Sequence, residues 1–127
     1  FVKRLTRRFE GTVVWDGETL ERTDCLAVAA GTVEQIGLGF RPFRFTDTPG
    51  AMHAVGLGSS VARFAFELPR VYLRKPLTAA DNLERRVTSI HLQADGPIGF
   101  MFDGDFHRGP SELTVELGPD VRILGPR

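Results

Sequence analysis

The sequence is short of the residues and runs that mark several classes of protein. Cys25 is its only cysteine, so no intramolecular disulfide can form, which fits a reducing compartment. No run approaches the roughly 20 apolar residues of a membrane-spanning helix. Sixteen basic residues balance sixteen acidic ones. This net charge of zero argues against bulk electrostatic attraction to nucleic acid or to an anionic membrane as the main function.

Motifs for metals and nucleotides are missing as well. His53, His91 and His107 do not have ligand spacing, so no structural zinc site or other metal ligand is predicted. There is no Gly-x-x-x-x-Gly-Lys-Ser/Thr loop, and Gly37-Leu38-Gly39 is too short for a dinucleotide fingerprint. Cys25 opens an apolar run, which favours a core position over a nucleophile. Taken alone, the residues predict no ATP site.

The composition that remains is that of one soluble globular domain. Of 127 residues, 42% are hydrophobic and 25% charged, which is enough for a single core. The chain begins at Phe1, and Phe1, Val2, Leu5 and Phe9 have helical spacing, so we expect a fragment that starts in the tail of a helix. Basic residues gather in two places, where a solvated face is the simplest interpretation: Lys3, Arg4, Arg7, Arg8, Arg70, Arg74 and Lys75.

Most of the chain is typical of short strands separated by Gly, Pro and Asp. Residues 12–15 and 18–20 flank Asp16-Gly17, a favoured dipeptide of hairpin turns. Cys25–Ala30 is a continuous apolar run, as expected of a strand buried on both faces. Residues 37–50 contain three glycines and two prolines, so we expect an ordered loop there.

One helix is predicted after this loop. Ser59 or Ser60 can accept hydrogen bonds at its start. Apolar residues then recur at three- and four-residue steps, namely Val61, Phe64, Ala65, Leu68 and Tyr72. Pro69 removes a backbone donor and crowds the preceding turn, so we expect the helix to kink or end near Leu68.

Beyond the helix the apolar period returns to two, which predicts further strands. The alternating residues are Thr88, Ile90, Leu92 and Ala94; Ile98, Phe100 and Phe102; Leu113, Val115 and Leu117; and Val121 and Ile123. The predicted fold is therefore mainly β. We expect a single antiparallel, two-sheet, β-sandwich-like domain over residues 1–127 with one inserted helix.

Three Asp-Gly pairs occur, at 16–17, 95–96 and 103–104. Asp-Gly adopts positive φ angles at little cost, so each fits a tight turn, and for the first two we accept that interpretation. The third differs because Asp103 and Asp105 flank Gly104 at the end of a strand of large apolar side chains. Carboxylates fixed by a strand end can hold Mg²⁺ or take a proton from a hydroxyl. A plain turn and a functional site both stay open here.

The order of these segments resembles the C-terminal domain of the diacylglycerol kinase and sphingosine kinase-like lipid kinases. In that family a first hairpin, a buried strand with a glycine-rich loop, and a single helix with a basic end precede a strand ending in Asp-Gly-Glu. A Pro-containing turn, a Leu-Val strand and a strand closing on Leu-x-Pro follow. The similar segments here are Trp15–Glu18, Cys25–Ala30, Gly37–Pro42, Ala54–Lys75, Val87–Leu92, Met101–Asp105, Gly109–Pro110, Glu112–Leu117 and Ile123–Pro126.

The resemblance implies a role in an ATP- and magnesium-dependent lipid kinase. An N-terminal domain with a Gly-Gly-Asp-Gly-Thr nucleotide loop, outside this chain, would complete the enzyme, and the lipid hydroxyl is phosphorylated in the cleft between the two domains. By the same resemblance Asp103 and Asp105 are catalytic and Gly104 lies at the nucleotide. The implied substrate is diacylglycerol or a sphingoid base. We expect a cytoplasmic protein at the inner membrane face, with Arg70–Lys75 against anionic headgroups, and no nucleic-acid partner.

Two positions depart from the family pattern. Asp105 replaces the usual Glu, which keeps the charge but shortens the reach by one methylene. Where the family has Asp-Asp-Gly-x-x-Asp around a structural magnesium, Thr48–His53 read Thr-Pro-Gly-Ala-Met-His. Without those carboxylates the cation site is expected to be lost or greatly weakened. Asp47 and His53 either form a replacement pair or belong to a surface loop.

Three functions follow as alternatives. The first is the substrate-side domain of an active lipid kinase, inactive as this fragment because phosphoryl transfer needs both halves. The second is a catalytically degenerate lipid-binding module of the same origin, favoured by the missing acids at 48–53. The third is a self-associating β module, expected to form a homodimer through exposed edge strands.

Overall fold

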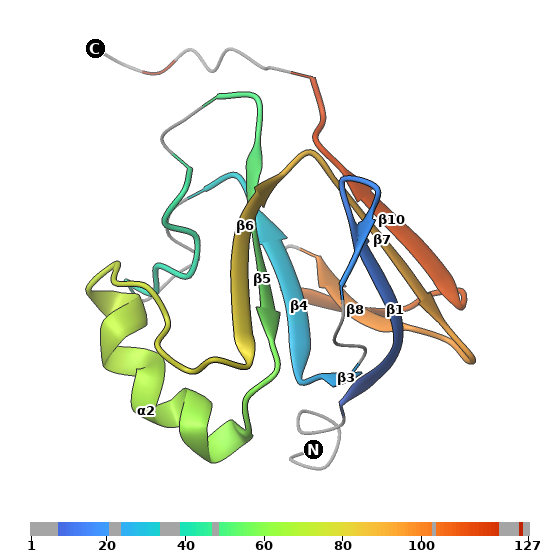
Figure 1. The fold of residues 1–127 in the computed structure, drawn as a ribbon. Helices are drawn as coiled ribbons and strands as arrows, with labels where there is room; N and C mark the ends of the chain where they lie inside the picture. The colour runs from blue at the N-terminus through green and yellow to red at the C-terminus, as the bar shows by residue number, and fades with distance from the viewer. Residues whose placement is uncertain are drawn as a thin grey trace.

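The computed structural model describes residues 8–20, 24–33, 39–46, 49–102, 104–119 and 125. In these ranges the chain forms ten strands and one helix (Figure 1). The elements are β1 (Phe9–Trp15), β2 (Glu18–Thr19), β3 (Asp24–Cys25), β4 (Ala27–Gly31), β5 (Met52–Leu57), α2 (Val61–Tyr72), β6 (Asn82–Val87), β7 (Ser89–Ala94), β8 (Gly99–Phe102), β9 (Asp105–Arg108) and β10 (Glu112–Glu116).

The strands form three sheets. One has the order β10-β7-β1-β2 with β3 beside β1, the second has the order β4-β5-β6, and β8 and β9 form a two-stranded hairpin. Every pairing in the described part of the chain is antiparallel. The prediction of a mainly β, antiparallel domain with one helix is confirmed, and the β8–β9 hairpin adds a small third sheet to the two expected.

The main core lies between the two larger sheets. Val13 and Trp15 of β1 and Ile90 and Leu92 of β7 alternate toward it, which confirms the face predicted for the residues around Ile90. Residues of the β4-β5-β6 sheet close it from the other side. The buried members of this core are Val13, Trp15, Leu20, Met52, Ala54, Val87, Ile90, Leu92 and Ile98. Since two sheets bury facing apolar side chains, the arrangement is a sandwich.

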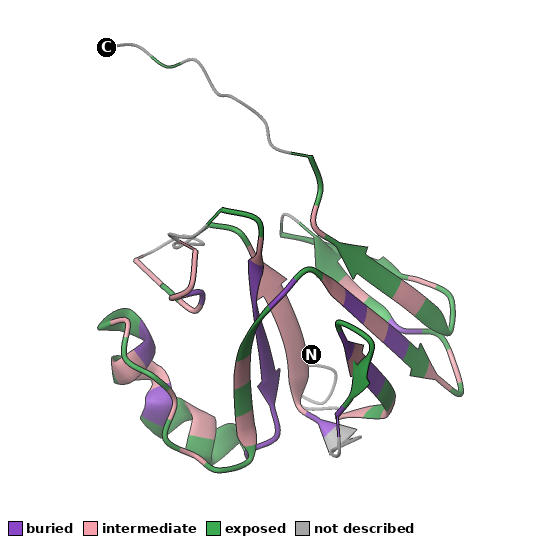
Figure 2. Ribbon diagram, turned by 45° about the horizontal axis from the view of Figure 1, so that its top comes forward, coloured by how far each residue is buried: buried purple, intermediate pink, exposed green. Residues whose placement is uncertain are grey.

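A third layer covers the far face of the β4-β5-β6 sheet. There Phe43, Val55 and Leu57 form a second core, with Phe64 of α2 and Leu77 packed against it. All six residues of β5 are buried, as Figure 2 shows along the strand. In Figure 1, α2 and loop 39–46 lie on one side of this sheet, and the β1-containing sheet lies on the other.

Three strands were not predicted, namely β5, β6 and β9, of which β9 directly follows the predicted Asp-Gly turn at 103–104. The resemblance placed the single helix from Ala54 onward, but residues 52–57 form β5 and the helix begins at Val61. Because His53 and Gly56 interrupt the apolar run of residues 52–57, the sequence did not indicate a strand there, although β5 is buried on both faces. The charged stretch Asn82–Val87 forms β6 at the edge of the sheet, where alternate side chains reach solvent.

The helix itself begins as predicted but does not end as predicted. The Ser60 hydroxyl accepts from the Arg63 N–H at 3.2 Å, as an N-cap does. The helix continues past Pro69 to Tyr72, and the Leu73 N–H donates to the Pro69 carbonyl at 3.2 Å. Pro69 frees only the carbonyl of Ala65, and because both residues are exposed, water can satisfy it.

The first Asp-Gly pair forms the predicted turn and also has a tertiary role. Asp16 and Gly17 have φ values of 51° and 81° between β1 and β2. The Asp16 carboxylate accepts from the Thr88 N–H at 2.9 Å, the Thr88 hydroxyl at 2.8 Å and the Ser89 N–H at 2.9 Å. The hydrogen bond from the Thr88 backbone does most to lower the pKa of Asp16. The turn therefore fixes the corner at which β6 passes into β7.

Other predictions have mixed outcomes. Cys25 is buried as expected, although a bend at Leu26 divides its run into β3 and β4. Phe9 opens a strand and does not continue a helix. Residues 39–46 form no regular element, as predicted for that loop. Phe1, Val2, Leu5, Val121 and Ile123 lie outside the described residues. In the described ranges no helix has the length and apolarity to cross a bilayer.

Gly11 provides a test of the β1–β7 packing. A Cβ there would collide with the carbonyl oxygen of Gln93, so Gly11→Ala must shift one strand. We expect it to lower the free energy of unfolding by about 1–3 kcal/mol, measured by urea denaturation with the single tryptophan as probe. The matched control is Gly99→Ala, another strand glycine, which has open space around it. It should be neutral or stabilising by up to about 1 kcal/mol, and equal losses in both variants would contradict the packing.

Candidate functional site

Asp105, one of the two predicted acids, directly follows the turn of the β8–β9 hairpin. Phe102 pairs with Asp105 across this turn. Gly104 has a φ of 85°, as a tight Asp-Gly turn requires. Asp105 is exposed at the start of β9, and Asp103 lies outside the described residues. The catalytic roles assigned to Asp103 and Asp105, and the nucleotide role of Gly104, stay predictions.

The β8–β9 hairpin packs into the core at its base, and the large side chains near its turn are exposed. Ile98 is buried in the main core, and its carbonyl accepts from the Gly109 N–H at 2.8 Å. The Phe100 ring stacks on His107 with 5.2 Å between centroids. Met101, Phe102 and Phe106 nevertheless remain exposed. A short hairpin with three exposed large apolar side chains is typical of a surface that meets another part of a protein.

No cation site is present in the part of the chain that the structure describes, where no three His, Cys, Asp or Glu side chains gather. Of the residues that stand in place of the family's acids, Pro49 is exposed and His53 is 0% exposed in β5, while Thr48 lies outside the described residues. The interpretation of His53 as part of a surface loop is therefore wrong. Asp47, its suggested partner, lies outside the described residues. Among described side chains, nothing forms a set of ligands for Mg²⁺.

A pocket that the sequence did not predict lies under α2. It has a volume of about 230 Å³ and is lined by the far face of the β4-β5-β6 sheet, the inner face of α2 and loop 39–46. We call it the α2 pocket. Its apolar lining comes from Ala29, Phe40, Pro42, Val55, Leu57, Phe64, Val71 and Leu77, and its polar lining from Arg41, Arg44, Lys75 and Glu84. Asp105 is not among the residues that line it.

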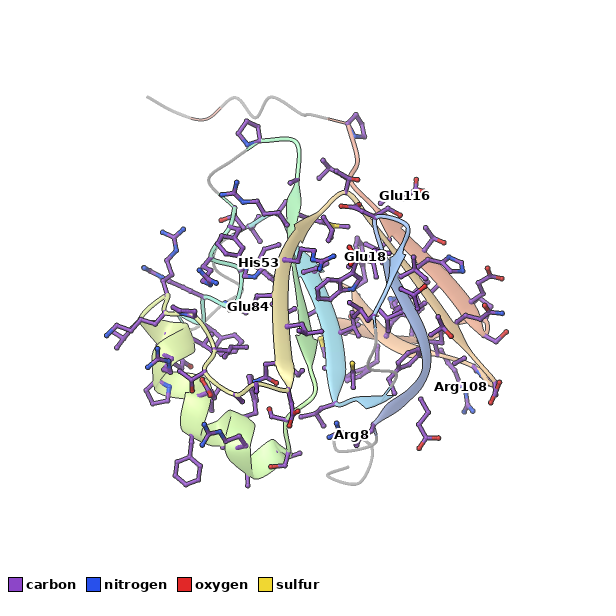
Figure 3. The ribbon with its side chains drawn as sticks, in the orientation of Figure 1. Arg8, Glu18, His53, Glu84, Arg108 and Glu116 are labelled. Atoms are coloured by element: carbon purple, nitrogen blue, oxygen red, sulfur yellow. The ribbon has the colours of Figure 1, made fainter. Side chains whose placement is uncertain are left out.

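Glu84 organises the polar side of the α2 pocket. Arg44 donates to both carboxylate oxygens from Nε and Nη2, each at 3.2 Å, and the Leu77 N–H donates to Oε2 at 3.3 Å. His53 accepts the Phe45 N–H on Nδ1 at 3.4 Å, which leaves its proton on Nε2, 3.4 Å from Glu84 Oε1. Figure 3 labels His53 and Glu84 in neighbouring strands of the sheet.

This network holds an ionised carboxylate against an apolar cavity. Burial raises the pKa of Glu84, but the contacts of His53, Arg44 and the Leu77 N–H outweigh burial and keep the pKa below its usual value. The same contacts tie loop 39–46 to the sheet, because Arg44 and the Phe45 N–H belong to the loop, whereas Glu84 belongs to β6 and His53 to β5. The ion pair of Arg44 and Glu84 therefore fixes the polar side of the α2 pocket, and the side chains of β4 and β5 form its apolar floor.

A second buried carboxylate fixes the segment that follows α2. Glu67 is 2% exposed, and its oxygens accept from the Thr78 hydroxyl at 2.6 Å and from the N–H groups of Thr78 and Ala79, each at 3.0 Å. The hydrogen bond from the Thr78 hydroxyl is the main cause that lowers the pKa of Glu67. Leu77, which lines the α2 pocket, directly precedes Thr78 and Ala79. Glu67 therefore holds this edge of the pocket against the helix.

The fold has counterparts among solved structures. A crystal structure of a putative diacylglycerol kinase from Bacillus anthracis str. Sterne matches with a TM-score of 0.61 at 18% identity, covering 86% of this chain and 39% of that chain. A second structure of a putative diacylglycerol kinase from the same organism gives a TM-score of 0.56 at 19% identity, covering 86% and 37%. No family model matches the sequence. No curated protein matches it either.

The resemblance that segment order predicted is thus confirmed at the level of the fold. The chain spans about two fifths of the length of the solved chains that it matches. At these identities the likeness concerns architecture, so activity and substrate are taken up below as proposals.

Glu67 gives a prediction for pH dependence. Its pKa is lowered from 4.5 in the folded state, so its stabilising effect is present above that value and is lost as pH falls through the folded pKa. Glu67→Gln should lower the free energy of unfolding by about 1.5–3 kcal/mol at neutral pH. The difference in the free energy of unfolding between this variant and the parent chain should become smaller below the unfolded pKa of 4.5. Urea denaturation at a series of pH values measures this difference. The exposed Glu116→Gln serves as control, and a gap for Glu67→Gln that is constant with pH would contradict this role.

Proposed function

We propose that this chain is the substrate-side domain of an ATP-dependent lipid kinase of the diacylglycerol kinase type, which phosphorylates a lipid hydroxyl. The structural similarity to a putative diacylglycerol kinase supports the proposal; it covers 86% of this chain and 39% of the solved chain. The rest of the enzyme, including the part that binds the nucleotide, belongs to a longer protein. The chain alone is expected to be inactive, because phosphoryl transfer requires both reactants to be held in line.

The α2 pocket is the place for an apolar part of the lipid. Its floor is made of aliphatic side chains from β4 and β5, and it is smaller than the roughly 300–1,000 Å³ of sites that enclose a whole small molecule. It therefore suits a segment of a hydrocarbon chain. Lys75 at the same pocket is suited to the polar end of a lipid, whereas Arg44 is engaged with Glu84.

The β8–β9 hairpin is the place for the chemistry. Asp103 and Asp105 take the role of the proton acceptor for the lipid hydroxyl, and the exposed side chains at the tip meet the nucleotide-binding part. Asp105 is exposed in this chain and would become effective once that part excludes water from it. ATP and its magnesium are assigned to the other part of the enzyme, as the resemblance to the lipid kinases implies.

A degenerate, lipid-binding module is the alternative. The observation that favours it is that His53, which stands where the family has the last acid of its motif, is a buried residue of β5. Such a module would keep the α2 pocket and bind lipid without turnover. Activity of the longer protein therefore decides between the two functions.

The test of catalysis uses the longer protein in which this domain occurs. With magnesium and ATP it is expected to phosphorylate diacylglycerol or a sphingoid base, and this chain alone is not. Asp103→Asn should abolish turnover, and Asp105→Asn should reduce it by at least about a hundredfold, the scale of general base catalysis. Glu116→Asn, on the exposed edge of β10, is the control. Lipid binding without turnover by the unaltered protein would support the degenerate module.

The test of the α2 pocket uses this chain and dioctanoylglycerol, with binding followed by calorimetry. Ala29→Leu should fill part of the cavity and displace about two methylenes of the lipid, at about 0.8 kcal/mol each. That loss corresponds to roughly tenfold weaker binding. Ala80→Leu, at an exposed position before β6, should leave binding unchanged. Equal affinity in the Ala29 variant would remove the α2 pocket from the proposal.

A further inference from the structure

The side of α2 that faces solvent is apolar. Ala62, Phe66, Pro69 and Leu73 follow one another at three- and four-residue steps, and all are exposed. Phe66 is 81% exposed and Leu73 is 65% exposed. Val61 and Tyr72, which neighbour this stripe on the helix surface, are also about half exposed. We call these six residues the outer α2 face.

The outer α2 face has no part in the packing of the domain. The inner face of the helix meets the sheet through Phe64, Glu67 and Val71. A surface helix ordinarily carries polar residues on the side away from its core. Here that side is occupied by large apolar side chains, so the fold itself gives no reason for Phe66 and Leu73. Exposed apolar patches of this kind mark surfaces that meet a partner.

The charges beside this face are of one sign. Arg63 and Arg70 border it along the helix, and Arg74 and Lys75 follow at its C-terminal end. The single acid of this segment, Glu67, is buried; it accepts hydrogen bonds from Thr78 and Ala79 and lies 3.9 Å from the Nε atoms of Arg63 and Arg70. Four basic residues thus share one carboxylate in this segment. The chain as a whole has no net charge. The cationic character is therefore local to the helix that carries the apolar stripe.

We infer that the outer α2 face docks on the surface of an anionic lipid bilayer. Phe66 and Leu73 enter the boundary between headgroups and acyl chains, and Arg63 and Arg70 lie level with the lipid phosphates. This combination of an apolar face with a basic border is what membrane-surface helices use. Since the described part of the helix has no exposed acid, its border is complementary in charge to an anionic lipid surface.

Docking in this orientation has a consequence that rests on the proposed function. Phe64 and Val71 of the same helix line the α2 pocket, so only the thickness of one helix separates that pocket from the bilayer. A lipid would reach the pocket by passing the edge of α2, without crossing water. Docking itself does not depend on the pocket or on catalysis.

Flotation with lipid vesicles tests the docking. The chain should float with vesicles of phosphatidylcholine and phosphatidylserine, and less with phosphatidylcholine alone. Phe66→Ser combined with Leu73→Ser should weaken binding at least about tenfold, since two apolar side chains no longer enter the bilayer. The matched control is Met101→Ser with Phe106→Ser, which removes side chains that are 56% and 65% exposed on the β8–β9 hairpin. It should bind like the parent chain.

The electrostatic part has its own variant. Arg63→Gln should reduce binding to vesicles with phosphatidylserine by about threefold or more and make it less sensitive to salt, while binding to phosphatidylcholine stays unchanged. Glu67 retains its hydrogen bonds from Thr78 and Ala79 in this variant. Circular dichroism of every variant shows that loss of binding is not loss of fold.

Two results would overturn the inference. One is unchanged vesicle binding by the Phe66 and Leu73 double variant. The other is no vesicle binding by the parent chain, together with self-association in sedimentation that this double variant abolishes; the face would then join two copies of the chain. Ala29→Leu separates this inference from the proposed function. This variant should bind dioctanoylglycerol more weakly but should still bind vesicles.

Discussion

Burial of β5 on both faces is the constraint on which the rest of the domain depends. Met52 and Ala54 pack toward Trp15 and the five-stranded sheet, so His53, Val55 and Leu57 must point the other way. That second face would be an open apolar surface without α2 and loop 39–46. The helix and the loop are therefore the required cover of a central strand, and the α2 pocket is the space that this cover leaves unfilled.

The same constraint explains the polar network. His53 lies in the covered face, and a buried imidazole is costly unless its nitrogen atoms find partners. The Phe45 N–H donates to Nδ1 and the Glu84 carboxylate lies 3.4 Å from Nε2, while Arg44 balances the charge that Glu84 introduces. Alternation in β6 then places Arg85 and Leu83 on the opposite face from Glu84. One buried histidine thus accounts for a charged sequence in a sheet strand and for the attachment of loop 39–46.

The sequence allowed the strands with regular alternation to be predicted, such as the one around Ile90, and also the Ser60 cap, because these signals are local. It did not allow β5 or β6 to be predicted, since burial of His53 and pairing of Glu84 depend on residues up to 40 positions away. The α2 pocket was missed for the same reason: its lining comes from β4, loop 39–46, β5, α2 with the residues that follow it, and β6. Phe64 and Val71 were a signal for it, because helical spacing put both on the face that meets the sheet. The Asp-Gly-Asp motif predicted a turn correctly, but chemistry at such a turn depends on what covers it.

The two candidate sites lie on different layers, and this separation limits how the domain can work. The hairpin with Asp105 follows Ile98, which packs between the larger sheets, whereas the α2 pocket lies beyond the β4-β5-β6 sheet. A lipid whose tail occupies the pocket must reach around an edge of that sheet to present its hydroxyl to the hairpin. Long, flexible substrates can do this and small rigid ones cannot. Under the proposed function, the geometry therefore favours a lipid with an extended chain, and the proposed docking of α2 would place the domain where such lipids are found.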